Sequence, residues 1–209
     1  MIAKARIFMD AGTVSRERLD QKRRTRAAIL AGARDLMERG EPVTVAQAAK
    51  VAGVSKATAY RYFTDPATLT AEAGLAARVA TYEEIVAGAE GLRARLLAIT
   101  LYFFDYPCDN EVAFRQFLAR YLDAWLADRK SADRGARRAV MFERALREDG
   151  NVPPPAWPAI VNALTLVTGA EAMITLFDIA HLDRAGARAT VRATAEALIE
   201  HHLGAAQAG

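Results

Sequence analysis

Two short runs of helix-forming residues meet at Gly53, and this arrangement constrains the fold more than any other part of the sequence. Thr44 is a favourable N-cap for the first run, and Ser55 is a favourable N-cap for the second. Gly53 lies between them, where glycine can adopt the positive φ that a sharp turn needs. We therefore predict a pair of short helices joined by a tight turn, within residues 44–63.

The rest of the sequence has helical spacing, with no strand-like alternation and many alanines, which favour helix. Residues 1–15 are predicted to form a flexible arm before a first helix that ends at Gly40. A fourth helix is predicted from Pro66 to about Ala89, because Asp65-Pro66 is a typical helix start. The prediction is an all-α chain of about nine helices. Later breaks are predicted at Gly91, 106–110, 131–135, 149–155 and 181–186.

Composition is that of a folded protein. Of the 209 residues, 52% are hydrophobic and 25% charged. No apolar stretch is long enough to cross a bilayer, and the first residues are too polar for a secretory signal, so we expect a cytoplasmic protein without a membrane partner. The single cysteine, Cys108, has no second cysteine or histidine pair at metal-ligand spacing, and we interpret it as a buried or half-buried packing residue.

Charge is distributed unevenly along the chain. Residues 1–64 hold 13 Lys and Arg against 6 acidic residues, a net charge of +7. Residues 65–209 hold 15 basic and 19 acidic residues, a net charge of −4. A basic N-terminal segment attached to an acidic body is typical of a module that binds a polyanion. The alternative is a charged helix face that merely contacts water.

The second short helix carries side chains suited to DNA. Lys56 and Arg61 can neutralise phosphate or donate to guanine, while Thr58 can contact a base. Ser55 and Tyr60 can donate to phosphate oxygens, and the small Ala57 would allow a close approach to the groove. Val54, Ala59 and Tyr62 are predicted to point inward, together with Ala48 and Ala52. A helical hairpin whose charges face water is the alternative.

The runs "RTRAAILAGARDLMERG" and "VTVAQAAKVAGVSKATAYRYF" resemble the N-terminal domain of the tetracycline-repressor (TetR) family of bacterial transcription regulators. The resemblance covers roughly residues 18 to 80 and is weaker beyond them. It implies a three-helix DNA-binding head, residues 16–65, followed by a larger helical domain, residues 66–209, that binds a small molecule and dimerises.

The same resemblance implies which side chains face DNA. The implied contact residues are Thr44, Ser55, Lys56, Thr58, Tyr60, Arg61 and Tyr62. For Tyr62 the helical spacing predicts the opposite, an inward position. Family members commonly have a lysine at the start of the next helix, whereas this chain has Asp65-Pro66. The basic residues before and within the first helix can compensate, or can simply face water: Arg16, Arg18, Lys22, Arg23 and Arg26.

The last two helices are predicted to form a dimer interface. One carries the apolar residues Leu164, Val167 and Ile174. The other carries a row of small residues that would let a partner helix come close, Ala189, Ala193 and Ala197. The resemblance implies that both pack against their copies in a four-helix interface. Two heads held about 34 to 36 Å apart would then read a palindrome in successive major grooves. Packing within a single chain is the alternative.

An effector pocket is predicted between the middle helices. Its candidate lining is mainly aromatic and consists of Phe103, Phe104, Phe117, Tyr121, Trp125, Phe142, Met173 and Phe177. Such a lining favours an apolar or aromatic small molecule of unknown identity. Aromatic residues at helical spacing are also typical of an ordinary core.

The predicted function is therefore a homodimeric transcription regulator that binds double-stranded DNA and is released from a palindromic operator by a small molecule. An effector-independent DNA-binding protein is the first alternative, and a helical enzyme is the second. No catalytic residue, metal site or cofactor is predicted, because the chain has no nucleophile elbow, phosphate loop or Cys/His cluster. Its three histidines, His181, His201 and His202, lie at a helix end and near the tail.

Overall fold

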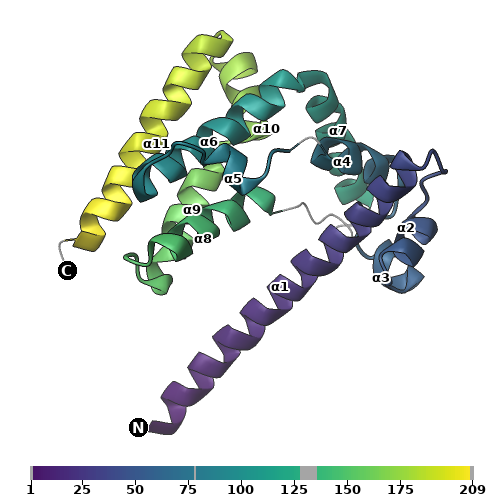
Figure 1. The fold of residues 1–209 in the computed structure, drawn as a ribbon, viewed down its shortest axis with the longest axis horizontal. Helices are drawn as coiled ribbons and strands as arrows, with labels where there is room; N and C mark the ends of the chain where they lie inside the picture. The colour runs from purple at the N-terminus through teal and green to yellow at the C-terminus, as the bar shows by residue number, and fades with distance from the viewer. Residues whose placement is uncertain (1, 78, 128–135, 208–209) are drawn as a thin grey trace. The chain divides into compact units, whose positions relative to one another are not determined.

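The protein is all-α in the residues that the structure describes, which confirms the predicted fold class (Figure 1). This computed structural model describes the backbone of residues 2–77, 79–127 and 136–207, and side chains within residues 20–76, 79–127 and 136–204. The described α-helices are α1 (Ile2–Glu38), α2 (Val45–Val51), α3 (Lys56–Tyr60), α4 (Pro66–Ala77), α5 (Tyr82–Ile85), α6 (Gly91–Asp109), α7 (Glu111–Ala127), α8 (Arg137–Asp149), α9 (Trp157–Leu166), α10 (Ala170–Ile174) and α11 (Arg184–Gln207). A short 3-10 turn, Pro154–Ala156, precedes α9, and a π-helical turn, Thr175–Ile179, follows α10.

The predicted fourth helix is divided into two. It ends at Ala77, and α5 begins after Thr81, whose side chain accepts a hydrogen bond from the Glu84 N–H at 3.3 Å. The Glu84 carboxylate in turn accepts the Thr81 N–H at 2.7 Å, which completes a capping box. The capping box starts a new helix, so the predicted continuation to Ala89 is wrong.

The apolar helix predicted near the C-terminus is also divided. Gly169, between α9 and α10, has a φ of 92°, a conformation that strongly favours glycine. A Cβ on this residue would lie 1.6 Å from Nη1 of Arg138 in α8. That guanidinium donates to the Thr168 carbonyl at 2.9 Å. The arginine therefore occupies the space that a side chain at position 169 would need.

The first helix begins earlier than the sequence predicts. Its backbone is helical from Ile2, so residues 2–15 continue α1 instead of forming a separate arm. Between Ile2 and Glu38 there is no proline, and Gly12 alone costs only about 1 kcal/mol relative to alanine. The predicted break at residues 131–135 lies outside the described residues.

Contacts divide the chain into two compact units. The first consists of Met1–Arg78 and Phe117–Gly135, and the second of Val79–Gln116 and Ala136–Gly209. In the first unit α1 packs against α2 and α4, and α2 packs against α3. α4 therefore groups with α1, α2 and α3 in the first unit. The core of the first unit is made by Ile29, Leu30, Ala33, Leu36, Val45, Ala48, Ala49, Ala59, Phe63, Leu69 and Ala73.

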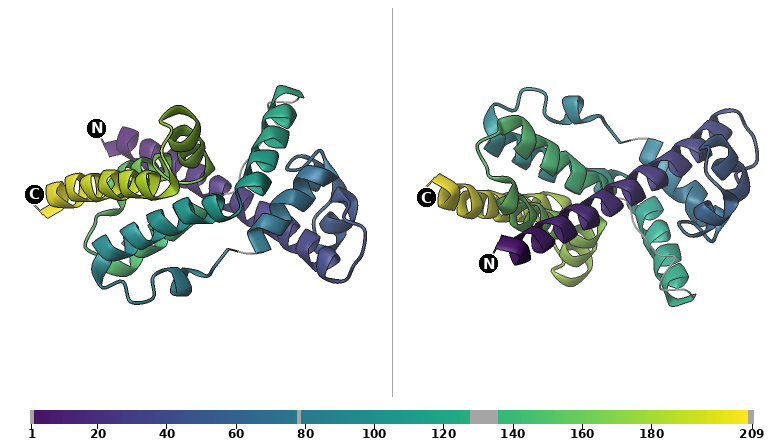
Figure 2. Two further views of the ribbon diagram at one scale, coloured as in Figure 1. Left: turned by 90° about the horizontal axis from the view of Figure 1, so that it is seen from above. Right: turned by 90° about the horizontal axis from the view of Figure 1, so that it is seen from below.

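In the second unit α6 packs against α8, α10 and α11 (Figures 1 and 2). Two buried clusters lie along it. The larger includes Leu96, Ile99, Phe142 and Leu164, and the smaller is centred on Phe104 and includes Met173 and Val191.

Among the described residues, no single helix is both long and apolar enough to cross a membrane. The bent pair Pro154–Leu166 and Ala170–Ile179 meets the criterion jointly, by length and composition only, with a bend of 41°.

Candidate nucleic-acid interface

The turn between α2 and α3 is closed by a hydrogen-bonded glycine motif. Gly53 has a φ of 68°, which confirms the predicted positive value. Its N–H donates to the Lys50 carbonyl at 3.2 Å, and the Val54 N–H donates to the Ala49 carbonyl at 3.0 Å. This is the Schellman pattern, which satisfies the last carbonyls of a helix. The two short helices are thereby held in one geometry.

Both predicted N-caps are confirmed. The Thr44 hydroxyl accepts the Gln47 N–H at 3.1 Å at the start of α2. The Ser55 hydroxyl accepts the Thr58 N–H at 3.1 Å at the start of α3. Each cap satisfies an amide that would otherwise lack a partner in the helix. Polar residues at these positions therefore have a structural role, whatever they contact outside.

The inward side of the helix pair is packed closely against α1. Ala48, Ala49 and Ala59 are almost fully buried. A Cβ at Gly32 of α1 would lie 2.7 Å from the Ala48 carbonyl oxygen, so only glycine allows this approach between α1 and α2. Sequence analysis missed Gly32, because an isolated glycine inside a helix does not indicate which neighbour comes close.

Most of the predicted DNA-contacting residues lie at the surface. Thr44, Ser55, Lys56, Tyr60 and Arg61 are exposed, and all belong to the same helix pair or its caps. Thr58 is half-buried. Tyr62 is also half-buried and packs against the core of the first unit, which agrees with the inward position that helical spacing predicts.

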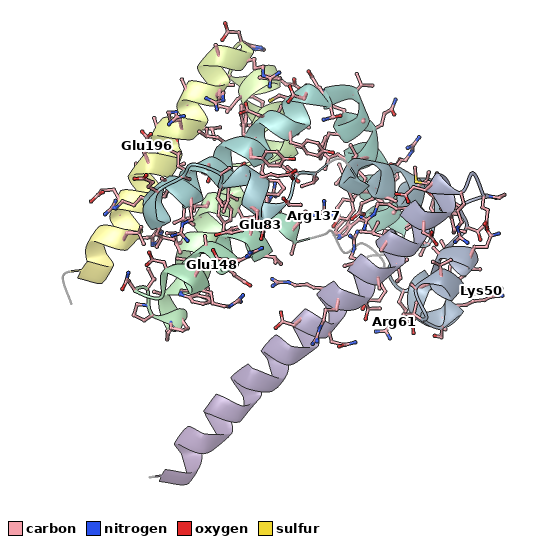
Figure 3. The ribbon with its side chains drawn as sticks, in the orientation of Figure 1. Lys50, Arg61, Glu83, Arg137, Glu148 and Glu196 are labelled. Carbon is pink, nitrogen blue, oxygen red and sulfur yellow. The ribbon has the colours of Figure 1, made fainter. Side chains whose placement is uncertain are left out.

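The helix pair carries positive charge that nothing nearby neutralises. Residues 42–64 contain no Asp or Glu. Lys50, Lys56 and Arg61 are exposed, and none of them forms an ion pair in the part of the chain that the structure describes. Figure 3 labels Lys50 and Arg61, whose side chains extend away from the ribbon.

Most arginines of the second unit form ion pairs, in contrast. Arg144 joins Glu83 and Glu148, two of the residues labelled in Figure 3, through nitrogen–oxygen distances of 2.6 and 2.8 Å. Ion pairs in this unit involve Arg93, Arg95, Arg115, Arg138, Arg144, Arg184, Arg188 and Arg192. The unpaired cations on α2 and α3 are therefore not a general property of this arginine-rich chain.

Asp65, which precedes Pro66 at the start of α4, caps this helix. Its carboxylate accepts the Thr68 N–H at 2.8 Å, the Thr68 hydroxyl at 2.8 Å and the Ala67 N–H at 3.1 Å. Partial burial acts to raise the pKa of Asp65, but these hydrogen bonds and the charge of Arg120 lower it overall. A charged carboxylate at this helix start disfavours a phosphate contact there.

One of the basic residues considered for DNA is inside the protein. Arg26 is 6% exposed and forms a two-pronged ion pair with Glu72 of α4, with 2.6 Å between Nη2 and Oε2. Its guanidinium also lies 4.8 Å from the centre of the Phe63 ring. The hypothesis that Arg26 contacts DNA is therefore wrong for this conformation. Lys22 is exposed, Arg23 lies 3.8 Å from Asp20, and the side chains of Arg16 and Arg18 are outside the described residues.

The residues predicted to line one pocket are found in three places. Phe103 and Phe142 are buried in the larger cluster of the second unit. Phe104, Met173 and Phe177 belong to its smaller cluster. Phe117, Tyr121 and Trp125 lie on the part of α7 that belongs to the first unit.

The residues predicted for the dimer interface differ in exposure. Ala189, Ala193 and Ala197 are exposed along α11. Leu164 is fully buried inside the protomer, and Val167 and Ile174 are half-buried. Leu166, the last residue of α9, is 79% exposed, and its helical spacing did not single it out as an interface residue. α9 and α11 contact each other, so Leu166 and the alanines belong to neighbouring helices.

Metal-ligating side chains do not cluster among the described residues. Within the described residues, no group of three or more His, Cys, Asp or Glu side chains is arranged to hold a metal ion. His201 and His202 contact each other edge to face, with ring centres 5.0 Å apart. Burial lowers the pKa of His202, and the neighbouring His201 lowers it further.

Comparison with known proteins found no matching family model, no matching curated protein and no matching solved structure.

Proposed function

We propose that the protein is a sequence-specific regulator that binds double-stranded DNA through α2 and α3, in the manner of the TetR family that its N-terminal segment resembles. The observation that carries the proposal is the capped helix pair with three exposed, unpaired cations, Lys50, Lys56 and Arg61, in a segment without acidic residues. Such a surface suits a phosphate backbone, because each cation displaces a condensed counterion on binding. The turn at Gly53 is closed by the Schellman hydrogen bonds and fixes α3 relative to α2. This suits a helix that is held rigidly against a groove.

A homodimer is part of the proposal. One five-residue helix reads few bases, and a palindrome read by two copies multiplies the specificity. Ala189, Ala193 and Ala197, together with the exposed Leu166, support α9 and α11 as the surface that a second copy covers. Small residues allow helices to approach closely, and Leu166 supplies apolar area that is otherwise left in water.

Selection of bound sequences from random duplex DNA tests the DNA-binding proposal. We expect a palindrome whose half-sites are separated by about one helical turn. Affinity, measured by fluorescence anisotropy, should fall steeply with salt, and Lys50→Ala should reduce the slope of log K against log[salt] by about 0.9 per head. Recovery of random sequences, with salt-insensitive binding, would show that the protein is not a sequence-specific DNA-binding regulator.

Oligomeric state tests the dimer independently of DNA. Ala193→Glu places a carboxylate in the middle of the exposed alanine row, and we expect it to convert a dimer into a monomer in sedimentation equilibrium. Ala119→Glu, at an exposed alanine of α7, is the matched control and should remain dimeric. The proposed dimer would be contradicted if the wild-type protein sedimented as a monomer at concentrations far above the Kd of its DNA complex.

The proposed effector is an apolar or aromatic small molecule, and the support for it is the family resemblance. Specific observations favour a second candidate, a regulator without an effector. Phe104, Phe142 and Met173 are fully buried in two separate clusters, an arrangement typical of a closed core. A screen for compounds that raise the melting temperature, followed by operator affinity with each compound, separates the two. A coupling of about 1 to 3 kcal/mol would weaken operator binding about 5- to 150-fold.

A further inference from the structure

The segment between α4 and α6 covers part of the larger buried cluster of the second unit. It consists of residues 79–90, which we call the strap, and contains the four-residue helix α5, which contacts α6 (Figure 1). Val79, Ile85 and Val86 are half-buried and pack against the cluster. Tyr82 belongs to the cluster itself and is 6% exposed. The strap therefore shields apolar surface with only a few side chains.

The backbone hydrogen bonds that stiffen the strap are local. The Ile85 N–H donates to the Thr81 carbonyl at 3.1 Å, and the Val86 N–H donates to the Tyr82 carbonyl at 3.0 Å. The capping box between Thr81 and Glu84 is also internal to the strap. These bonds hold the strap together but do not attach it to α6 or α8, so it can move as one piece.

Two tyrosine hydroxyls fasten the strap to those helices. The Tyr102 hydroxyl of α6 accepts the Ala80 N–H at 2.7 Å. The Tyr82 hydroxyl donates to the Glu148 carboxylate of α8 at 2.9 Å. One fastening therefore holds the start of the strap, and the other holds the first residue of α5.

Arg144 of α8 adds a bridge at the surface. Its guanidinium donates to Glu83 of α5 and to Glu148, which Figure 3 labels. The side chains of Arg144 and Glu83 are 40% and 66% exposed. Water therefore competes for both charges, and the pair adds little. The tyrosine hydroxyls are the main fastening.

Left-handed glycines lie where the strap meets α6. Gly88 has a φ of 74°, and Gly91, the first residue of α6, has a φ of 76°. A Cβ on either residue would have no heavy atom of the described residues within 4 Å. Backbone conformation, not crowding, therefore favours glycine at both positions. A few such residues can absorb the φ and ψ changes of a hinge.

We propose that the strap opens as a unit about Gly88 and Gly91 while α6 and α8 stay folded, and that the hydroxyls of Tyr82 and Tyr102 form the latch that keeps it closed. The strap begins where the chain passes from the first unit to the second, so the latch sets how firmly α4 is tied at this connection. Opening then weakens binding to a palindrome, which requires two heads at a fixed separation. This last step rests on the proposed function.

Hydrogen exchange of the full-length protein, followed by mass spectrometry, tests the latch without DNA. Strap amides should exchange together and faster than those of α6. Tyr82→Phe and Tyr102→Phe each remove one hydroxyl and keep the ring, so each should speed strap exchange about 5-fold and leave α6 unchanged. Trp157→Phe, which removes a hydrogen bond to the Val152 carbonyl outside the strap, is the matched control. Strap exchange no faster than that of α6, or equal effects of all three variants, overturns the latch.

Gly88→Ala tests the hinge. Alanine strains the left-handed closed conformation and is relieved if φ changes on opening, so strap exchange should rise about 5-fold. Gly40, with a φ of 67° and open space at its Cβ, lies outside the strap. Gly40→Ala should therefore leave strap exchange at the wild-type rate. Unchanged strap exchange in Gly88→Ala would show that Gly88 keeps its conformation on opening, which overturns the hinge.

Hydrogen exchange of the DNA complex tests the regulatory step. Because coupling between sites is reciprocal, the selected palindrome should slow strap exchange by at least about 5-fold. A single half-site imposes no separation on the heads, so at saturation it should leave strap exchange unchanged. Equal slowing by both duplexes, or by neither, overturns the coupling to DNA. Failure to select any preferred sequence overturns the proposed function and this coupling together, whereas the free protein decides the latch by itself.

Discussion

Arg26 of α1 and Glu72 of α4 form a buried ion pair within the head, with both side chains almost excluded from water. The two residues are 6% and 8% exposed, and two nitrogens of the guanidinium meet two oxygens of the carboxylate. Arg26 also lies against the ring of Phe63, just beyond α3. The pair therefore connects α1, α4 and the segment after α3 within one cluster.

Removing one partner of this pair should be far more costly than removing both. We expect Arg26→Ala and Glu72→Ala each to lower the free energy of unfolding by about 3 to 5 kcal/mol, because the remaining charge is buried without a partner. The double variant Arg26→Met with Glu72→Leu should be close to the wild type. Urea unfolding followed by circular dichroism measures all three.

A matched control for this prediction is the exposed pair between Arg39 and Asp35, whose nitrogen–oxygen distance is 2.5 Å. Arg39→Ala should cost less than about 1 kcal/mol, because water solvates the remaining carboxylate. Equal costs for Arg26→Ala and Arg39→Ala would show that burial of the Arg26–Glu72 pair has no energetic consequence.

Gly32 and Gly74 are helical glycines with opposite expectations. A Cβ at Gly32 would lie 2.7 Å from a backbone oxygen of α2, so Gly32→Ala should destabilise the head by about 1 to 3 kcal/mol. A Cβ at Gly74 of α4 would lie 3.7 Å from the flexible end of Met37, an ordinary contact. Gly74→Ala should therefore stabilise the protein by about 0.5 to 1 kcal/mol. Thermal unfolding of the two variants measures both changes in stability. If Gly32→Ala stabilised the protein, the close approach of α1 to α2 at Gly32 would be contradicted.

The Asp65 cap should give stability that depends on pH. Its pKa is lowered in the folded protein, so the contribution is complete above the ordinary value of 3.8 and is lost as the pH falls through the lower folded value. At pH 7, Asp65→Ala should cost about 1 kcal/mol. This cost should diminish in increasingly acidic buffer. Asp65→Asn keeps a capping oxygen without titrating, so the wild type should lose stability in acidic buffer relative to this variant. The same pH profile in the wild type and in Asp65→Asn would exclude titration of the cap as the cause.

Cys108 should react slowly with thiol reagents. The pKa of the Cys108 thiol is raised from 9.0 to about 11, mainly by burial; Arg184 opposes this rise, and the carboxylates of Asp105, Asp109 and Glu111 add to it. At pH 8 the thiolate fraction is then about 100-fold below that of an unperturbed thiol. We expect the rate of reaction with iodoacetamide to rise about tenfold per pH unit up to pH 10. A rate that levels off near pH 9, as for the urea-unfolded control, would contradict the raised pKa.

Local sequence signals predicted the helix pair well. Thr44, Gly53 and Ser55 act through their own backbone and the next few residues, so their roles as caps and turn were predicted without knowledge of the fold. The same holds for the exposure of Lys56 and Arg61, which follows from the burial of Ala59 on a helix of known period.

The predictions that failed missed either a local helix start or a contact between residues distant in sequence. The division of the fourth helix follows a local capping box at Thr81, yet the run of helix formers across it hid the boundary. The need for glycine at position 169 involves Arg138, which is distant in sequence and fills the space beside the glycine. Arg26 was considered for DNA because its charge is visible in the sequence, whereas its partner Glu72 is visible only in the folded head.

By itself, the sequence determined the all-α class, the capped turn at Gly53 and the cluster of cations on the helices around it. These features depend on backbone propensity, capping and helical period, which act over a few residues. Tertiary structure decided which hydroxyls are already bonded, which arginines are paired, that Leu164 is inside and Leu166 outside, and that the predicted pocket residues belong to separate clusters. Those properties depend on which distant side chains come into contact, and helical spacing alone leaves several such arrangements open.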